Sequence, residues 1–337
     1  YILAYLIVVI GGSLLLYAYK GSQIRSRQNA ERYSRESMLL LNNILLMTAL
    51  CVVFLGTLLP LVHKQLGLGT ISVGAPFFNQ MFLIIMTPFA LLLGIGPLVK
   101  WRRDAFSAVR KPVIISLIFT LAAGFGLPYF LQDRITISAV LGTMMVVFIV
   151  LLNLYELHQR ATHKYPFFKG ILKLSRSQWG MVLAHLGIAM TIWGIAFSQN
   201  YSIERDVRMN VGDHTTIGDY EFKFNGIQDT NGANYLGGQA KIEVYKKTQP
   251  EAVLFAEKRF YTVSKMSMTE AAIDWGFTRD LYVALGERLE DGSWAIRLYY
   301  KPFIRWIWFG GLFMALGGIL CLFDRRYRFN QLVKVNI

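Results

Sequence analysis

Seven apolar stretches constrain the fold of this chain more than any other feature of its sequence. Each is close to the length needed to cross the roughly 30 Å hydrocarbon core of a bilayer. Lipid offers exposed backbone groups no hydrogen-bond partner, so a chain that crosses it is predicted to be helical there. The stretches are residues 1–18, 38–62, 78–99, 112–131, 136–156, 179–199 and 303–323. With 17% charged residues and a mean hydropathy of +0.39, the composition is typical of a multi-pass membrane protein.

The basic residues predict which loops face the cytoplasm. Lysine and arginine gather after the first, third, fifth and seventh stretches, within residues 20–37, 100–111, 157–178 and 324–337. The short opposite loops carry only Lys64 and Arg134. Positively charged loops stay inside the cell, so the four basic loops are predicted to be cytoplasmic. The net charge of +14 is then mainly a signal of topology, and its dispersal over four loops argues against a nucleic-acid partner.

One outer segment, residues 200–301, is long, slightly acidic and patterned like a soluble domain. Five stretches in it alternate apolar and polar residues, as half-buried strands do: TTIGDYEFKFNGIQD, GQAKIEVYKK, AVLFAEKRFYTV, LYVALG and SWAIRLYY. Turn sequences such as Asn231-Gly232 and Asp291-Gly292 separate them. The sequence therefore predicts a polytopic α-helical membrane protein with a β-rich periplasmic domain between the last two spans.

This reading divides the chain into four parts. Residues 1–199 form a membrane bundle of about six spans, and residues 200–301 form the periplasmic β-rich domain. Residues 302–323 form the final transmembrane helix, and residues 324–337 form a basic cytoplasmic tail. The predicted location is a bacterial inner membrane, with lipid around the spans.

The sequence carries few groups of its own for catalysis. It has no GxSxG, GxxxxGK[ST], HExxH or CxxC motif. Cys51 and Cys321 both fall inside apolar spans and far apart, so each is expected to be a small buried hydrophobe rather than half of a disulfide. Asn153 and Glu156 lie near a cytoplasmic helix end, where snorkelling or a helix–helix hydrogen bond explains them.

One histidine, His185, lies about 10 Å inside the sixth span, at about 1.5 Å per residue. Two interpretations stay open for it. It is a packed histidine hydrogen-bonded to a polar side chain of a neighbouring helix, or it is an axial ligand to the iron of an intramembrane heme. Gly187, Thr191 and Gly194 leave room along one helix stripe, either for another helix or for a flat macrocycle.

The other four histidines have simpler interpretations. His158 and His163 belong to a basic loop, and His214 lies in a turn-like GDHTT segment. His63 ends the second span at the outer interface, where an imidazole is common. A ligand or substrate-contact role for His63 stays open beside that interpretation.

Five segments of the chain are distinctive: AHLGIAMTIWGIAFSQNYSIERDVRMNVGD, YYKPFIRWIWFGGLFMALGGILCLFDRRYR, MTEAAIDWGFTRDLYVALGE, SRESMLLLNNILLM and LGTLLPLVHKQLGLG. With these segments the chain resembles the CcmF family of cytochrome c maturation proteins. The resemblance covers essentially the whole chain and concerns the C-terminal half of the family. The start of the chain at Tyr1, inside an apolar stretch, likewise predicts that it is the later part of a longer protein.

The resemblance implies a heme lyase of the cytochrome c synthetase type in a bacterial inner membrane. Such a protein receives heme from a periplasmic heme chaperone and attaches it to the CxxCH motif of apocytochrome c, together with thiol-handling and chaperone subunits. It implies a buried heme b held by two histidines from membrane helices, and His185 matches the later of them. The family's tryptophan-rich WWD segment and its two periplasmic histidines have no match here. This chain is therefore expected to need an N-terminal half for heme transfer.

A cofactor-centred mechanism suits a chain with no nucleophile or acid–base pair of its own. Thioether attachment needs ferrous iron and reduced thiols, so a buried heme b is a candidate reductant. Two other classes stay open: half of a transporter for heme or another small solute, and a non-catalytic membrane scaffold for cytochrome assembly. Few charged groups in the spans and no evident inverted repeat weigh against the transporter.

Overall fold

The structure, a computed structural model, describes residues 2–21, 31, 33–101 and 106–324. The predicted basic tail from residue 325 onwards lies outside the described residues. The basic residues of 22–30 and 102–105 also lie outside them.

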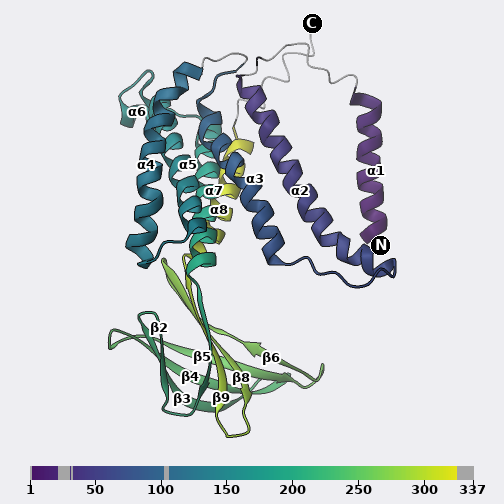
Figure 1. Ribbon diagram of the computed structural model, residues 1–337, viewed down its shortest axis with the longest axis vertical. Helices are drawn as coiled ribbons and strands as arrows, with labels where there is room; N and C mark the ends of the chain where they lie inside the picture. The colour runs from purple at the N-terminus through teal and green to yellow at the C-terminus, as the bar shows by residue number, and fades with distance from the viewer. Residues whose placement is uncertain (1, 22–30, 32, 102–105, 325–337) are drawn as a thin grey trace. The chain divides into compact units, whose positions relative to one another are not determined.

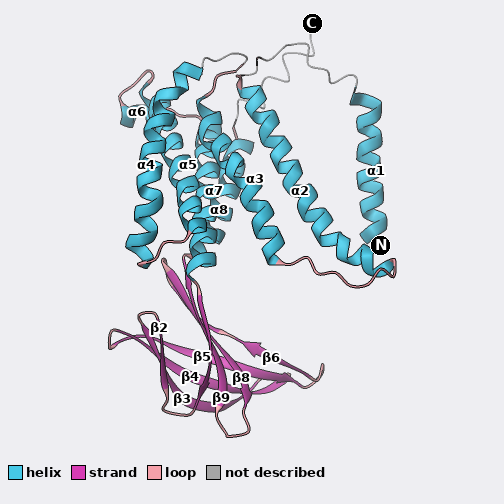
Figure 2. Cartoon of the chain, in the orientation of Figure 1, coloured by secondary structure: helices cyan, strands magenta, loops and turns pink. Residues whose placement is uncertain are grey.

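All seven predicted spans fold as helices (Figures 1 and 2). Among the described residues, six helices are long and apolar enough to cross a membrane, and the first is a shorter apolar helix. The helices are α1 (Ile2–Lys20), α2 (Arg35–Gln65), α3 (Ala75–Ile95), α4 (Phe106–Gln132), α5 (Ile137–Thr162), α6 (Phe167–Ile171), α7 (Arg176–Tyr201) and α8 (Ile304–Leu322), with a 3-10 turn at Gly96–Leu98. The prediction of a polytopic helical membrane protein with a β-rich domain between the last two spans is confirmed.

Helix α7 starts earlier than its apolar stretch because a polar cap precedes it. The Ser175 hydroxyl accepts a hydrogen bond from the Gln178 backbone N–H at 3.3 Å. The Gln178 side chain accepts one from the Ser175 backbone N–H at 2.8 Å. This reciprocal pair satisfies two of the N–H groups that a helix start leaves open. The helix therefore begins at Arg176, and its first turn is polar.

The chain forms two compact units. The first comprises Tyr1–Ile85 and Gly96–Arg110, and contains α1 and α2. In it, the Ser34 hydroxyl caps α2, and the Arg35 backbone N–H donates to the Lys100 carbonyl at 3.0 Å. The second unit comprises Met86–Ile95 and Lys111–Ile337, and contains α5, α7, α8 and the β-rich domain.

In the second unit, α7 packs against both α5 and α8. The contact with α8 is close because glycines line both helices. A Cβ added at Gly187 would lie 2.6 Å from the Gly310 carbonyl oxygen, and one added at Gly180 would lie 2.5 Å from the Gly317 carbonyl oxygen. Small residues of this kind let transmembrane helix backbones approach each other. The stripe that the sequence left open to a helix or a macrocycle is filled by α8.

The β-rich domain is a sandwich of two antiparallel sheets (Figure 2). One sheet has the strand order β1-β9-β8-β7 and the other has the order β2-β3-β4-β5-β6. The strands are β1 (Ile203–Met209), β2 (His214–Ile217), β3 (Tyr220–Asn231), β4 (Tyr235–Lys246), β5 (Gln249–Tyr261), β6 (Met266–Glu270), β7 (Ala272–Trp275), β8 (Arg279–Arg288) and β9 (Trp294–Pro302).

The inward-facing residues of both sheets form one apolar core. Phe222, Phe224, Leu281 and Leu298 are fully buried in it. The domain is joined to the membrane helices by two neighbouring strands, because β1 follows α7 and β9 precedes α8. These strands pair in register from Ile203 opposite Tyr300 onwards. The sandwich thus makes up the segment of the chain that connects α7 to α8.

Candidate functional site

His185 lies in α7, facing α5, about 14 Å from the start of its helix at about 1.5 Å per residue. Its Nδ1 lies 3.0 Å from the Oδ1 atom of Asn153 in α5. The histidine is half-buried and the asparagine is fully buried. A hydrogen bond between a span histidine and a polar side chain of a neighbouring helix, one of the two interpretations of His185, is therefore present.

The asparagine determines which imidazole nitrogen carries the proton. The Asn153 amide nitrogen donates to the Ile149 carbonyl at 2.8 Å, one turn back in α5. The amide is thereby oriented with its oxygen toward His185. A carboxamide oxygen only accepts, so Nδ1 of His185 must be the donor. The neutral imidazole then carries its lone pair on Nε2, which is the tautomer that binds a metal through Nε2.

This arrangement fits one axial ligand of a heme iron. Within the described part of the chain, no group of three or more His, Cys, Asp or Glu side chains comes together to hold a metal ion. A heme needs no such group, because its macrocycle supplies four nitrogen ligands and the protein adds imidazole along the axis. The His185–Asn153 pair resembles the usual pattern in which a ligating histidine donates its other N–H to an oxygen.

Glu156 adds a buried acidic group one turn from Asn153. Its side chain is 5% exposed and pairs with Arg160 of the same helix. The interpretation of Asn153 as a helix–helix hydrogen-bonding residue is confirmed, whereas Glu156 does not snorkel. It is instead buried with a cation as its partner, as intramembrane carboxylates usually are.

Each of the remaining histidines has its own local setting. His63, in the last turn of α2, has its Nδ1 3.0 Å from the Gly69 carbonyl. His158 and His163 are exposed at the end of α5, where the His158 ring packs 5.4 Å from that of Phe167. His214, in β2, is exposed and lies 3.9 Å from the Glu221 carboxylate. A ligand role for His63 stays a prediction.

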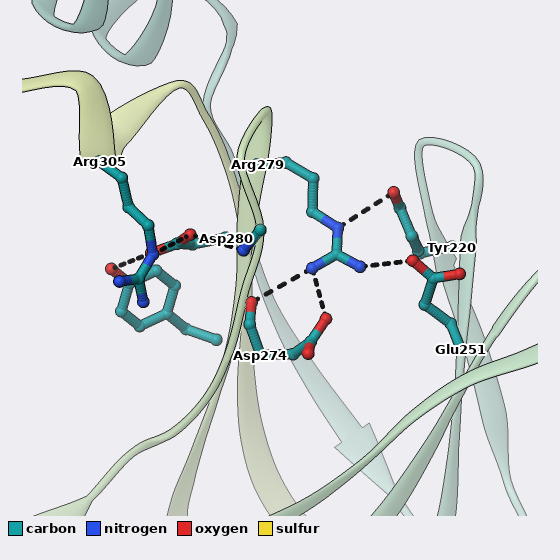
Figure 3. A network of polar contacts seen from close by, with 8 residues as sticks. Tyr220, Glu251, Asp274, Arg279, Asp280 and Arg305 are labelled. Atoms are coloured by element: carbon teal, nitrogen blue, oxygen red, sulfur yellow. Dashed lines mark hydrogen bonds and ion pairs between the residues drawn. The ribbon is translucent and has the colours of Figure 1, made fainter.

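A second polar network lies in the sandwich, where Arg279 joins its two sheets (Figure 3). Nε of Arg279 donates to the Tyr220 hydroxyl at 3.1 Å, and Nη2 donates to Glu251 at 2.6 Å. Both partners belong to the five-stranded sheet, whereas Asp274, which pairs with Nη1, belongs to the four-stranded one. Burial opposes the charge, but hydrogen bonds to Tyr220 and Asp274 outweigh it and raise the pKa of Arg279 above its ordinary value. Arg279 therefore stays charged and ties the sheets together.

The next residue, Asp280, connects the sandwich to the membrane helix α8 (Figure 3). It is 2% exposed, and its Oδ1 accepts from Nε of Arg305 at 2.9 Å. Arg305 lies in the first turn of α8. Sequence reasoning missed both Arg279 and Asp280. An Arg-Asp pair at the start of a strand gives no signal that the two side chains will be buried on opposite sides of it.

The β-rich domain matches a known family. Residues 200–302 match the family described as CcmF C-terminal beta-sandwich. The chain is 79% identical over 334 residues to the cytochrome c-type biogenesis protein CcmF of Haemophilus influenzae, covering 99% of this chain and 52% of that protein. It is 56% identical over 328 residues to the protein of the same name from Escherichia coli, covering 97% of this chain and 50% of that protein.

A solved structure shares the fold. The chain superimposes on a structure titled Cytochrome c Heme Lyase CcmF with a TM-score of 0.72 at 23% identity. The match covers 87% of this chain and 46% of that one. The chain thus spans about half the length of the relatives it matches.

Proposed function

We propose that this chain, which belongs to the CcmF family of cytochrome c-type biogenesis proteins, forms the heme-holding half of a membrane heme lyase that attaches heme to apocytochrome c. The family membership rests on the close relatives described above. The observation that carries the rest is the His185–Asn153 pair. It presents an imidazole of defined tautomer inside a membrane bundle.

In this proposal His185 would hold the iron of a heme b through Nε2, and Asn153 would orient the imidazole. A bound heme b would supply an electron to keep the substrate heme iron ferrous, the state that thioether attachment needs. The protein's part is to keep the ligand neutral, fix its direction and exclude water. The close α7–α8 contact and the capped start of α7 hold the helix that carries His185 in place.

The proposed partners follow from the same family. The substrate heme comes from a heme chaperone, and the acceptor is apocytochrome c presented with its thiol-handling and chaperone subunits. The remaining half of the lyase contributes the tryptophan-rich segment and the second axial histidine. We propose that the sandwich frames the surface where these partners dock, because both its ends enter membrane helices and keep it at the mouth of the bundle.

An absorption spectrum of the purified intact protein tests the proposal directly. A b-type heme spectrum with resolved α and β bands on reduction is the expected result. A transporter half or a non-catalytic scaffold predicts protein without bound heme. Purification without any heme absorption would therefore overturn the lyase proposal in favour of those two classes.

The proposed location is the bacterial inner membrane, with the sandwich in the periplasm. It follows from the basic loops, since residues 157–178, between the fifth and sixth apolar stretches, carry three lysines and two arginines. A reporter that is active only in the cytoplasm should be active when it is inserted after Lys164, an exposed position in that loop. The same reporter should be inactive when it is inserted after Ala233, in the exposed β3–β4 turn. Equal readouts at the two sites would contradict this topology.

A further inference from the structure

The loop that joins β7 to β8, residues 276–278, is bonded to the first turn of α8. The Trp306 indole N–H donates to the Phe277 carbonyl at 2.9 Å. The Phe303 backbone N–H donates to the Thr278 carbonyl at 2.8 Å. Two residues further on, Asp280 accepts from Arg305 (Figure 3). These contacts fix the height of the loop relative to the start of a membrane-spanning helix.

The length of α8 places that start at the edge of the hydrocarbon. Its 19 residues rise about 28 Å at about 1.5 Å per residue. The hydrocarbon core is about 30 Å thick, so the helix has no turns to spare. Its first turn must then lie at the boundary between hydrocarbon and headgroups. A loop hydrogen-bonded to that turn lies at the level of the lipid headgroups.

The loop and the strand end before it expose two large aromatic side chains. Trp275 is 70% exposed and Phe277 is 66% exposed. The Phe277 ring lies 5.2 Å from that of Trp306, and the Arg305 guanidinium lies 5.0 Å from the centre of the Trp275 ring. Large apolar side chains exposed next to one another mark a surface that contacts a protein or a membrane. Aromatic rings beside a cation are the composition that concentrates at membrane–water interfaces.

We infer that Trp275 and Phe277 insert into the headgroup layer of the bilayer, so that the base of the sandwich rests on lipid. Lipid is favoured over a protein partner because the loop is bonded to the first turn of α8, and that turn lies at the level of the lipid headgroups. Trp308, two residues after Trp306 and so only about 3 Å further along the helix axis, is 74% exposed and adds another aromatic side chain near the same depth. The inference requires only that α8 crosses the membrane, and it does not depend on the heme chemistry.

Depth-dependent quenching tests the inference in the intact protein. Phe277→Cys and Glu290→Cys are each labelled with the fluorophore NBD after Cys51 and Cys321 are replaced with alanine. Glu290 is the control, because it is exposed in the β8–β9 turn at the opposite end of β8. The proteins are placed in phosphatidylcholine nanodiscs that contain lipids with a nitroxide on the headgroup or high on the acyl chain. Iodide serves as the aqueous quencher.

The label at Phe277 should lose most of its emission to nitroxide lipids and little to iodide, with a blue-shifted spectrum. The label at Glu290 should show the reverse. Two results would overturn the inference. Quenching by iodide alone at Phe277 would place the loop in water. Protection from both quenchers would show that a protein surface, rather than lipid, covers the aromatic pair.

Discussion

Replacing His185 with alanine should remove nearly all b-type heme from the intact protein and stop cytochrome c assembly with it. The substitution deletes the proposed axial ligand and leaves a cavity rather than a buried charge, so the helices should still insert. Heme absorption of the purified protein and the yield of covalent cytochrome c measure the two losses. Protein abundance in the membrane should stay near that of the unsubstituted protein.

Two further variants sharpen this expectation. His158→Ala should change neither readout, because that side chain is exposed at the end of α5. Asn153→Leu keeps His185, the proposed ligand, but removes the acceptor that fixes its tautomer, and it should weaken heme retention about 10- to 100-fold. A full heme spectrum in His185→Ala would show that His185 is only a packed histidine. Loss of heme with normal cytochrome c assembly would support His185 as the ligand but would exclude the role of the buried heme as a reductant.

Replacing Gly310 with leucine should separate α7 from α8 and destabilise the protein by about 3 kcal/mol. A Cβ there would lie 2.8 Å from the Thr191 backbone nitrogen, and it would also collide with the Gly187 carbonyl. Both are backbone atoms, so only movement of a whole helix relieves the clash. The amount of folded protein recovered in detergent and its unfolding temperature measure the effect.

The neighbouring glycine provides a matched control. A Cβ added at Gly311 would have no atom within 4 Å, although it lies in the same turn of the same helix. Gly311→Leu should therefore leave stability unchanged within about 0.5 kcal/mol. Equal damage by both substitutions would mean that helix propensity or insertion, rather than the α7–α8 contact, limits stability.

The membrane helices could be predicted from the sequence because lipid imposes a minimum length on apolar segments. The first turn of α7 was missed, since Arg176, Ser177 and Gln178 are polar and belong to it through a cap. In the sandwich, strand β1 (Ile203–Met209) gave no signal. Most of its residues are exposed and only Met209 is buried, so it lacks the alternation that reveals other strands.

The site could be predicted only in part, for a different reason. The depth of His185 follows from counting residues along one helix. Its partner does not, because the pairing with Asn153 depends on how α5 and α7 are rotated about their axes. For the same reason, the sequence alone left it open whether a helix or a macrocycle packs against the stripe of Gly187, Thr191 and Gly194, and the structure shows that α8 does. The roles of Arg279 and Asp280 could not be predicted, because they depend on how the two sheets and α8 pack together.

The pairing of β1 with β9 has a consequence for the order of assembly. About a hundred residues separate α7 from α8, and closing so long a flexible loop costs about 4 kcal/mol in chain entropy. Folding of the sandwich already closes this loop before the helices pack, because it holds Ile203 opposite Tyr300. The ends of the two helices are then delivered side by side. The last transmembrane helix should therefore dock only after the sandwich has folded, and slow folding of the sandwich would delay completion of the membrane bundle.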